Sequence, residues 1–143
     1  MIVICDLDGT LSDTEHRVHF LQREPQDWDG FFAASKDDPP IWPVIHTVRA
    51  LKAAGHEIHV LTGRSDSARD DTIAWFEQFG VPCDRLLMRR NGDGTADEVL
   101  KRNWFEADYS FDDVLVVIDD RKAVVDMWRG LGLVCLQPAP GDF

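Results

Sequence analysis

Residues 1–11 read MIVICDLDGTL, and this stretch decides the fold class. A short apolar run begins the chain and stops at Asp6. Continuous apolar runs of this length are typical of strands that are buried on both faces of a parallel sheet. Asp8 and Gly9 follow at once, and glycine permits a tight turn at this point. The stretch therefore predicts a buried strand that delivers two carboxylates to its carboxyl end.

The same pattern recurs along the chain. Further apolar runs that predict strands cover residues 57–62, 85–88, 114–118 and 133–136. Helical patterns lie between them: one from Pro43 to Gly55, one that Ser65 or Asp66 can cap and Gly80 ends, one that Thr95 can cap, and one from Ala123 to Gly130 or Gly132. Alternating strands and helices predict an α/β protein, a single Rossmann-like doubly wound parallel sheet.

One segment, residues 11–42, breaks this alternation. It holds several polar residues and two modest helical patches, around residues 16–22 and 28–34. The segment is too short for a second domain, and a length of 143 residues is typical of one domain. We therefore expect one domain over residues 1–143, with residues 11–42 as a flap or minimal cap over the end of the first strand.

Composition and charge exclude several classes of protein. The chain is 44% hydrophobic and 29% charged, as in globular proteins, and its net charge is −11. It lacks the basic surface that usually holds duplex nucleic acid. No apolar run approaches the roughly 18 residues of a membrane span, and the first run meets an acid too early for a secretory signal. We expect a cytoplasmic protein without a membrane partner.

Polar side chains follow three of the predicted strands. Asp6 and Asp8 follow the first, Thr62-Gly63-Arg64 the second and Asp119-Asp120-Arg121 the fourth, while Lys101 lies on a predicted helix. The carboxyl ends of parallel strands meet at one edge of a sheet, where ligands bind. Several oxygen ligands in one place suit Mg²⁺.

This set of side chains fits phosphoryl transfer. A carboxylate beside a bound metal can attack phosphorus, and a second carboxylate can protonate the leaving oxygen and then activate water. The Thr62 hydroxyl, the amides around Gly63 and the Lys101 ammonium can neutralise the phosphate oxygens. The sequence therefore predicts a phosphate-handling site at the carboxyl edge of the sheet.

The four patterns D-x-D-G-T-L, T-G-R, a downstream Lys and D-D, in this order, resemble the motifs of the haloacid dehalogenase (HAD) superfamily. The resemblance implies that Asp6 is the nucleophile and Asp8 the general acid and base. It implies that Mg²⁺ is held by Asp6, the backbone carbonyl of Asp8, and one or both of Asp119 and Asp120. The phosphate-binding residues would be Gly9, Thr10, Thr62, Gly63 and Lys101.

A narrower resemblance covers nearly the whole chain, although residues 18–45 match poorly. Residues 118–121 (IDDR), 124–129 (VVDMWR) and 141–143 (GDF) are similar to the 3′-phosphatase domain of bacteriophage-type polynucleotide kinase-phosphatases. This similarity implies five substrate-binding residues, Arg17, Arg64, Arg89, Asp97 and Arg121. The sequence contains no phosphate-binding loop of the G-x-x-x-x-G-K-[ST] type, so we expect no kinase domain within it.

We therefore expect a Mg²⁺-dependent phosphomonoesterase that forms an aspartyl-phosphate and acts on nucleic-acid 3′-phosphate ends. A nucleotidase, or another phosphatase for small molecules, is the first alternative. A phosphoacceptor receiver domain is a more distant alternative. Receivers place their acid pair after the first strand and the phosphoacceptor after the third, whereas here D-x-D follows the first predicted strand and D-D the fourth. The pattern leaves open the oligomeric state, any separate kinase or ligase, and which of Asp119 and Asp120 binds the metal directly.

Other conspicuous residues have simpler explanations. We expect reduced and mostly buried thiols at Cys5, Cys83 and Cys135, because their spacing fits neither a metal site nor a redox pair. The acid pair Asp112-Asp113 precedes a strand, so it predicts a solvated turn at the opposite edge. We expect core positions for Trp75, Trp104 and Trp128, and surface positions for His16 and His19. Trp28 and Trp42 are the tryptophans suited to stacking on a base.

Overall fold

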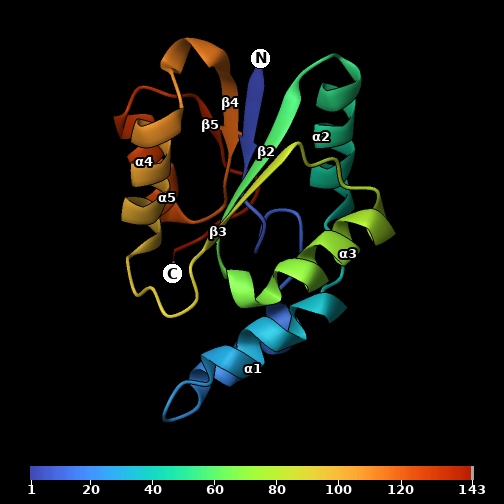
Figure 1. Cartoon of the computed structure of the whole chain (residues 1–143), viewed down its shortest axis with the longest axis vertical. Coiled ribbons are helices and arrows are strands. Elements are labelled where there is room, and N and C mark those ends of the chain that lie inside the picture. The colour runs from blue at the N-terminus through green and yellow to red at the C-terminus, as the bar shows by residue number, and fades with distance from the viewer. Residues whose placement is uncertain (143) are drawn as a thin grey trace.

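The computed structural model, which describes residues 1–142, is built on one parallel sheet (Figure 1). Within this range the sheet has five strands in the order β3-β2-β1-β4-β5. The strands are β1 (Ile2–Cys5), β2 (Glu57–Ser65), β3 (Arg85–Arg89), β4 (Val114–Ile118) and β5 (Cys135–Leu136). This confirms the α/β class and the parallel sheet. Phe143, part of the GDF similarity, lies outside the described residues.

Strand β1 lies at the centre of the sheet, and the chain order reverses there. Val3 pairs with Ile58 of β2 on one side and with Val116 of β4 on the other. The chain first builds β2 and β3 on one side of β1, and later adds β4 and β5 on the other side. Such a switch point is where open α/β sheets bind ligands, and Asp6 and Asp8 follow β1 directly.

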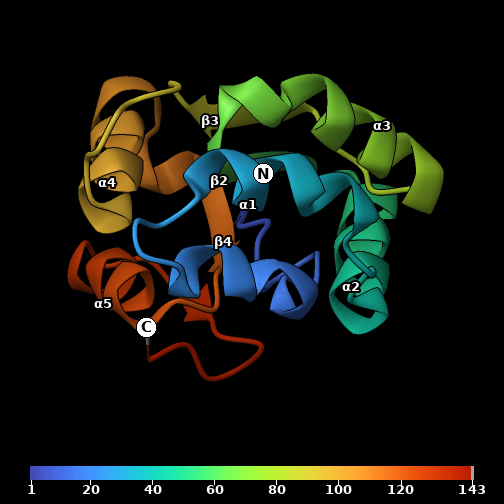
Figure 2. The same ribbon diagram turned by 90° about the horizontal axis from the view of Figure 1, so that it is seen from below.

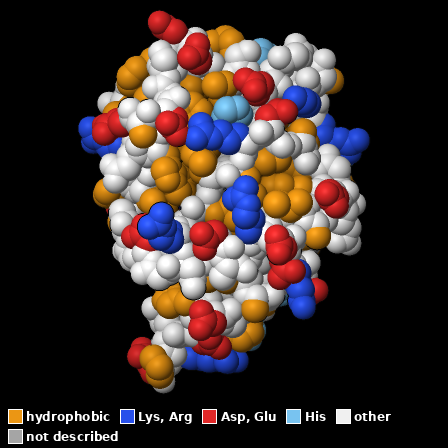
Figure 3. Space-filling model, in the orientation of Figure 1, with side chains coloured by type: hydrophobic (Ala, Val, Ile, Leu, Met, Phe, Trp, Pro, Cys, Tyr) orange, Lys and Arg blue, Asp and Glu red, His pale blue; other side chains and the backbone are white. Residues whose placement is uncertain are grey.

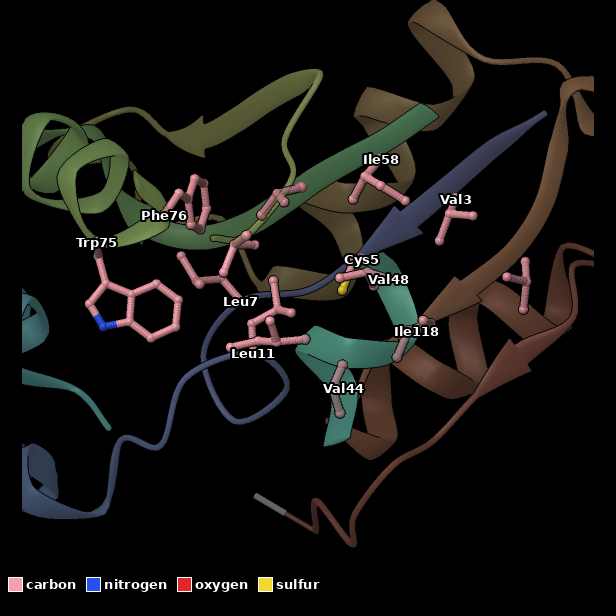
Figure 4. Close-up of a cluster of buried hydrophobic side chains, with 14 residues drawn as sticks. Val3, Cys5, Leu7, Leu11, Val44, Val48, Ile58, Trp75, Phe76 and Ile118 are labelled. Carbon is pink, nitrogen blue, oxygen red and sulfur yellow. The ribbon is translucent and has the colours of Figure 1, made fainter. Parts of the chain in front are cut away.

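Helices cover both faces of the sheet (Figures 1 and 2). Helices α2 (Trp42–Ala53) and α3 (Arg69–Phe79) lie on one side, and α4 (Asp97–Asp108) and α5 (Lys122–Gly130) on the other. Two buried clusters result. The first includes Val3, Cys5 and Trp75 (Figure 4). The second includes Ile4 and Trp128, so successive residues of β1 enter opposite cores, as a strand covered on both faces requires.

Several element ends differ from those predicted. Strand β5 begins at Cys135 rather than at residue 133, and α3 has Ala68 as its N-cap in place of Ser65 or Asp66.

Two further differences lie near the site. Strand β2 continues beyond Thr62 to Ser65. Its pairing with β3 is irregular between these two residues and resumes where Ser65 pairs with Arg89. The Thr62-Gly63-Arg64 motif therefore lies within the last part of the strand. Thr95 does not cap α4: Ala96 takes that place, and the Thr95 hydroxyl donates instead to Asp93 Oδ1 at 2.6 Å.

Residues 11–42 form the expected helical patches. They contain the 3₁₀ helix η1 (Glu15–Gln22), the short helix α1 (Trp28–Ala33) and the turn η2 (Ala34–Asp37). Seen from below in Figure 2, this segment crosses the carboxyl edge of the sheet. The backbone N–H of Ile41 donates to the Leu11 carbonyl at 2.8 Å, so the two ends of the segment are joined. The segment therefore leaves the sheet and returns at one point.

The tryptophans predicted in the core, the cysteines and the acid pair Asp112-Asp113 lie mostly where the sequence predicts. Trp75 and Trp128 are buried, while Trp104 is half-buried against the second cluster. The three cysteines are free thiols, and Asp112-Asp113 forms an exposed turn before β4. Across residues 1–142 the helices are too short or too polar to cross a membrane.

Candidate active site

Three carboxylates meet where β1 and β4 end. The backbone N–H of Asp6 donates to the Ile118 carbonyl at 2.8 Å, which extends the pairing of the two strands up to the acids. From α4, Lys101 Nζ donates to Asp6 Oδ1 at 2.7 Å and to Asp119 Oδ2 at 2.8 Å. The Thr10 hydroxyl lies 3.1 Å from Asp6 Oδ2 and 3.2 Å from Asp120 Oδ1. We call Asp6, Lys101, Asp119 and Asp120 the carboxylate cluster.

The carboxylate cluster carries more negative than positive charge in a buried place. Burial and the charge of Asp119 raise the pKa of Asp6 well above its usual range, although Lys101 opposes them. Burial also raises the pKa of Asp120. Burial alone would lower the pKa of Lys101, but Asp119 and Asp6 outweigh it and hold this pKa above its usual value.

This cluster fits a divalent cation. One carboxylate oxygen each of Asp6, Asp119 and Asp120 lies within 4.8 Å of the others. Hard oxygen ligands with a net negative charge are what Mg²⁺ prefers. A cation at this point would offset both the burial and the repulsion from Asp119 that raise the pKa values of Asp6 and Asp120.

Asp8 lies beside a pair of arginines. Arg17 donates through Nη2 to Asp8 Oδ1 at 2.7 Å, and Arg64 Nη2 contacts the same oxygen. Burial favours the neutral form of Asp8, but Arg64 and Arg17 outweigh it and lower the pKa of its carboxyl to about 2. The second carboxylate of the D-x-D pattern is therefore ionised in this state and fixed by two cations.

Asp38, which no sequence pattern singles out, holds both arginines. Arg17 donates to Asp38 through Nε and Nη2, both at 2.8 Å, and Arg64 Nη2 lies 3.3 Å from Asp38 Oδ2. His16 Nε2 lies 2.6 Å from Asp38 Oδ1. Asp38 is buried, whereas its neighbour Asp37 is exposed. No spacing rule separates two adjacent acids in a loop, so the sequence carries no signal for this role.

A second group of charges lies between β2, β3 and α4. Asp97 accepts from Arg89 Nη2, and it accepts from Arg121 Nη1 at 2.7 Å. Arg89 Nε donates to the Gly63 carbonyl at 2.8 Å. A Cβ at Gly63 would collide with the Asp97 carboxylate, so glycine is required for this close approach. The contacts bring the start of α4, and hence Lys101, against β2.

These groups line a pocket of about 810 Å³. Eleven of the fourteen predicted site residues line it: Asp6, Asp8, Thr62, Gly63, Arg64, Arg89, Asp97, Lys101, Asp119, Asp120 and Arg121. The other three, Gly9, Thr10 and Arg17, are not among its lining residues. Gly9 has a left-handed φ of +81°, and a Cβ there would collide with Asp120. Arg17 is fully buried behind Asp8.

Comparison with protein families identifies the chain. The model of the polynucleotide kinase PNKP phosphatase domain, a HAD-type family, matches residues 1–143. The chain belongs to this family. It is a phosphatase, as the sequence patterns predict, and this decides against the receiver alternative. A relative described as a bifunctional polynucleotide kinase/RNA ligase, from Autographa californica nuclear polyhedrosis virus, is 33% identical over 135 residues.

Solved structures agree with the family match. A chain in the Pnkp1/Rnl/Hen1 RNA repair complex is 33% identical, with a TM-score of 0.85 over 99% of this chain. A haloacid dehalogenase-like hydrolase from Streptococcus pneumoniae shares 13% identity and a TM-score of 0.67, covering 95% of this chain and 83% of that one, and shows the fold alone. The present chain matches 90% of its own length to 18% of the viral relative, and it covers 43% of the repair-complex chain.

Proposed function

We propose that this PNKP-type phosphatase is a Mg²⁺-dependent polynucleotide 3′-phosphatase that works through an aspartyl-phosphate. The carboxylate cluster at the switch point of the sheet carries this proposal, because it combines a buried nucleophile, a cation and room for a metal. A pocket of about 810 Å³ is far larger than a phosphate group and accommodates a nucleotide. We further propose that residues 1–143 act as one domain, with residues 11–42 as a minimal cap.

The metal site would consist of the Asp6, Asp119 and Asp120 carboxylates and the backbone carbonyl of Asp8. When bound, Mg²⁺ supplies Lewis-acid stabilisation of charge on the phosphate oxygens. Lys101, beside Asp6, adds a positive charge that neutralises the same oxygens. Thr62 and Gly63, which line the pocket, offer a hydroxyl and backbone amides to the phosphate.

In the first step, an Asp6 oxygen bonds to phosphorus as the bond from phosphorus to the 3′-oxygen breaks. Asp8 gives its proton to that leaving oxygen. In the second step, water adds to phosphorus, Asp8 accepts the proton of the water, and the bond between phosphorus and Asp6 breaks to release inorganic phosphate. The ionised Asp8 described above is the form required for the second step. A bound phosphate offsets the charge of Arg64 and so favours the protonated form required for the first.

The test compares phosphate release, with Mg²⁺ present, from three substrates: a 3′-phosphorylated oligonucleotide, a 5′-phosphorylated one and mononucleotides. We expect the first to be strongly preferred. The Asp6→Asn variant should lose activity by a factor on the order of 10⁴ or more. Asp112→Asn, at the opposite sheet edge, is the matched control and should keep full activity. Preference for mononucleotides would make the protein a nucleotidase, and turnover by a folded Asp6→Asn variant would contradict the mechanism.

A further inference from the structure

The pocket has a second end that is aromatic rather than charged. Helix α1 forms this end. Trp28, Phe31 and Phe32 of α1 line the same pocket as Asp6 and Lys101. Trp28 is 49% exposed, although its ring contacts those of Phe31 and Phe32. The wall formed by residues 91–97 is mostly polar and contains Gly92 and Gly94. The pocket thus joins a phosphate-handling end to an aromatic surface.

The Trp28 ring is held in place before any ligand binds. Its centroid lies 5.9 Å from that of Phe31, edge to face, and 5.8 Å from that of Phe32. The Asp27 carboxylate accepts from the Gly30 N–H at 2.9 Å and fixes the start of α1. Phe31 in turn packs against the Arg17 guanidinium, with 4.2 Å from Cζ to the ring centroid. Arg17 also contacts Asp8, so a buried side chain links Phe31 to the catalytic end.

We propose that Trp28 is a stacking platform for the nucleobase of the nucleotide that carries the phosphate. This inference rests on the proposed function and names the part of the substrate that the pocket reads. Aromatic side chains stack on any base and therefore give affinity for nucleotides without strong sequence preference. The base would lie on Trp28, the phosphate at the carboxylate cluster, and the sugar between them, beside the polar wall. The enzyme would thus discriminate nucleotide ends from phosphomonoesters that have no base.

Trp42 offers a matched control. It is exposed to a similar degree, 43%, but it packs on His46 and Phe79 and does not line the pocket. The experiment measures KM and kcat for two 3′-phosphorylated oligonucleotides that differ in one respect: the terminal nucleotide carries a base or is abasic. Glycerol 2-phosphate serves as a small phosphomonoester without a base.

We expect wild-type enzyme to prefer the base-bearing end, and Trp28→Ala to raise its KM roughly 10-fold, from the known range of base–aromatic stacking. The preference over the abasic end should then fall towards one. Trp28→Phe should restore most of the preference, and Trp42→Ala should retain it. The effect should fall on KM more than on kcat, because Trp28 would hold the base and not the reacting phosphate.

Two failures are distinguishable. If wild-type enzyme still prefers 3′-phosphorylated oligonucleotides but Trp28→Ala affects both ends equally, the stacking inference is wrong and the proposed function stands. If wild-type enzyme hydrolyses glycerol 2-phosphate better than either oligonucleotide, the proposed function is wrong, and the inference falls with it.

Discussion

At the scale of single residues, Asp38 is the acid on which the arrangement around Asp8 depends. It is buried, and Arg17 and Arg64 both contact it as well as Asp8. Removing one charge from a buried network leaves its partners uncompensated, which is costly. We predict that Asp38→Asn lowers the free energy of unfolding by on the order of 2–3 kcal/mol. It should also lower kcat by about 10-fold to 100-fold, because Asp8 is no longer held in place.

Steady-state kinetics and urea unfolding check this prediction. Asp37→Asn is the matched control, since Asp37 is the exposed neighbour of Asp38 on η2 and should show neither effect. A variant at Asp38 that is destabilised but retains full kcat would show that Asp38 supports the fold without positioning Asp8.

The ionisation of Asp8 predicts how stability depends on pH. Its pKa is lowered from 3.8 to about 2 because Arg64 and Arg17 outweigh the effect of burial. A carboxyl with a lowered pKa stabilises the folded state above its unfolded pKa, and this contribution is lost as pH falls through the folded pKa. Between about pH 4 and pH 2 the wild type should therefore lose about 2 kcal/mol that Asp8→Asn does not lose.

Urea unfolding of metal-free protein in metal-free buffer, at a series of pH values in this window, measures the difference between the two proteins. Parallel curves for wild type and Asp8→Asn would mean that the ion pairs with Arg64 and Arg17 contribute nothing to stability. The absence of added metal keeps metal binding at the neighbouring carboxylates out of the comparison.

At the scale of elements, the ends of β1 and β4 bring three acids together at a cost to the metal-free protein. The raised pKa of Asp120 means that its ionised form is less favourable in the folded state than in the unfolded chain. The cost grows as pH rises from the unfolded pKa towards the folded one, and it is fully present above the folded pKa. We predict that Asp120→Asn raises the melting temperature of the protein in chelator.

The same reasoning predicts the response to Mg²⁺. At about 100 times its dissociation constant, Mg²⁺ should add about 2.7 kcal/mol to the wild type, a rise on the order of 10 °C in melting temperature. Asp120→Asn should lose most of this rise, and Asp112→Asn should keep it. Calorimetric melting curves with and without Mg²⁺ decide the matter, and an equal rise in all three proteins would place the metal elsewhere.

The elements also show what the sequence could predict. Each central strand contains a mostly apolar run, so the sequence predicts β1, β2 and β4 close to their observed positions, together with the acids at the ends of β1 and β4. The ends of elements are less predictable from sequence, because local contacts decide them. The Arg89 contact with Gly63 and the pairing of Ser65 with Arg89 accompany the extension of β2, and no periodicity records either.

Residues 11–42 are less predictable from sequence for a different reason. The role of Asp38 depends on the path of a loop that returns to Leu11, and contacts between residues distant in sequence define that path. The position of Trp28 depends on α1 lying across the sheet edge. The sequence predicts Trp28 and Trp42 equally as stacking residues. The structure separates them, because Trp28 lines the pocket, whereas Trp42 packs on His46 and Phe79 and does not line it.

At the scale of the whole molecule, the charge distribution favours recognition of a chain end over recognition of a long strand. The net charge is −11, and on the face shown in Figure 3 the Lys and Arg side chains are interspersed with Asp and Glu. The basic residues that line the pocket are Arg64, Arg89, Lys101 and Arg121, and each has an acidic partner. Few of them are left to contact further phosphates along a strand.

The last prediction concerns substrate length and salt. Each phosphate of a single strand that a protein neutralises contributes about −0.7 to the slope of log affinity against log salt. With one or two such contacts, kcat/KM should fall less than about 10-fold between about 50 and 200 mM salt. KM for a 3′-phosphorylated dinucleotide should likewise lie within about 3-fold of that for a longer oligonucleotide, because the pocket holds the end alone.

The measurement is a length series at each salt concentration, with an oligonucleotide that ends in a 3′-hydroxyl as a competitor that should inhibit weakly. A KM that falls steadily with length, together with a steep salt slope, would place a strand-binding surface outside the pocket and contradict recognition by the end alone.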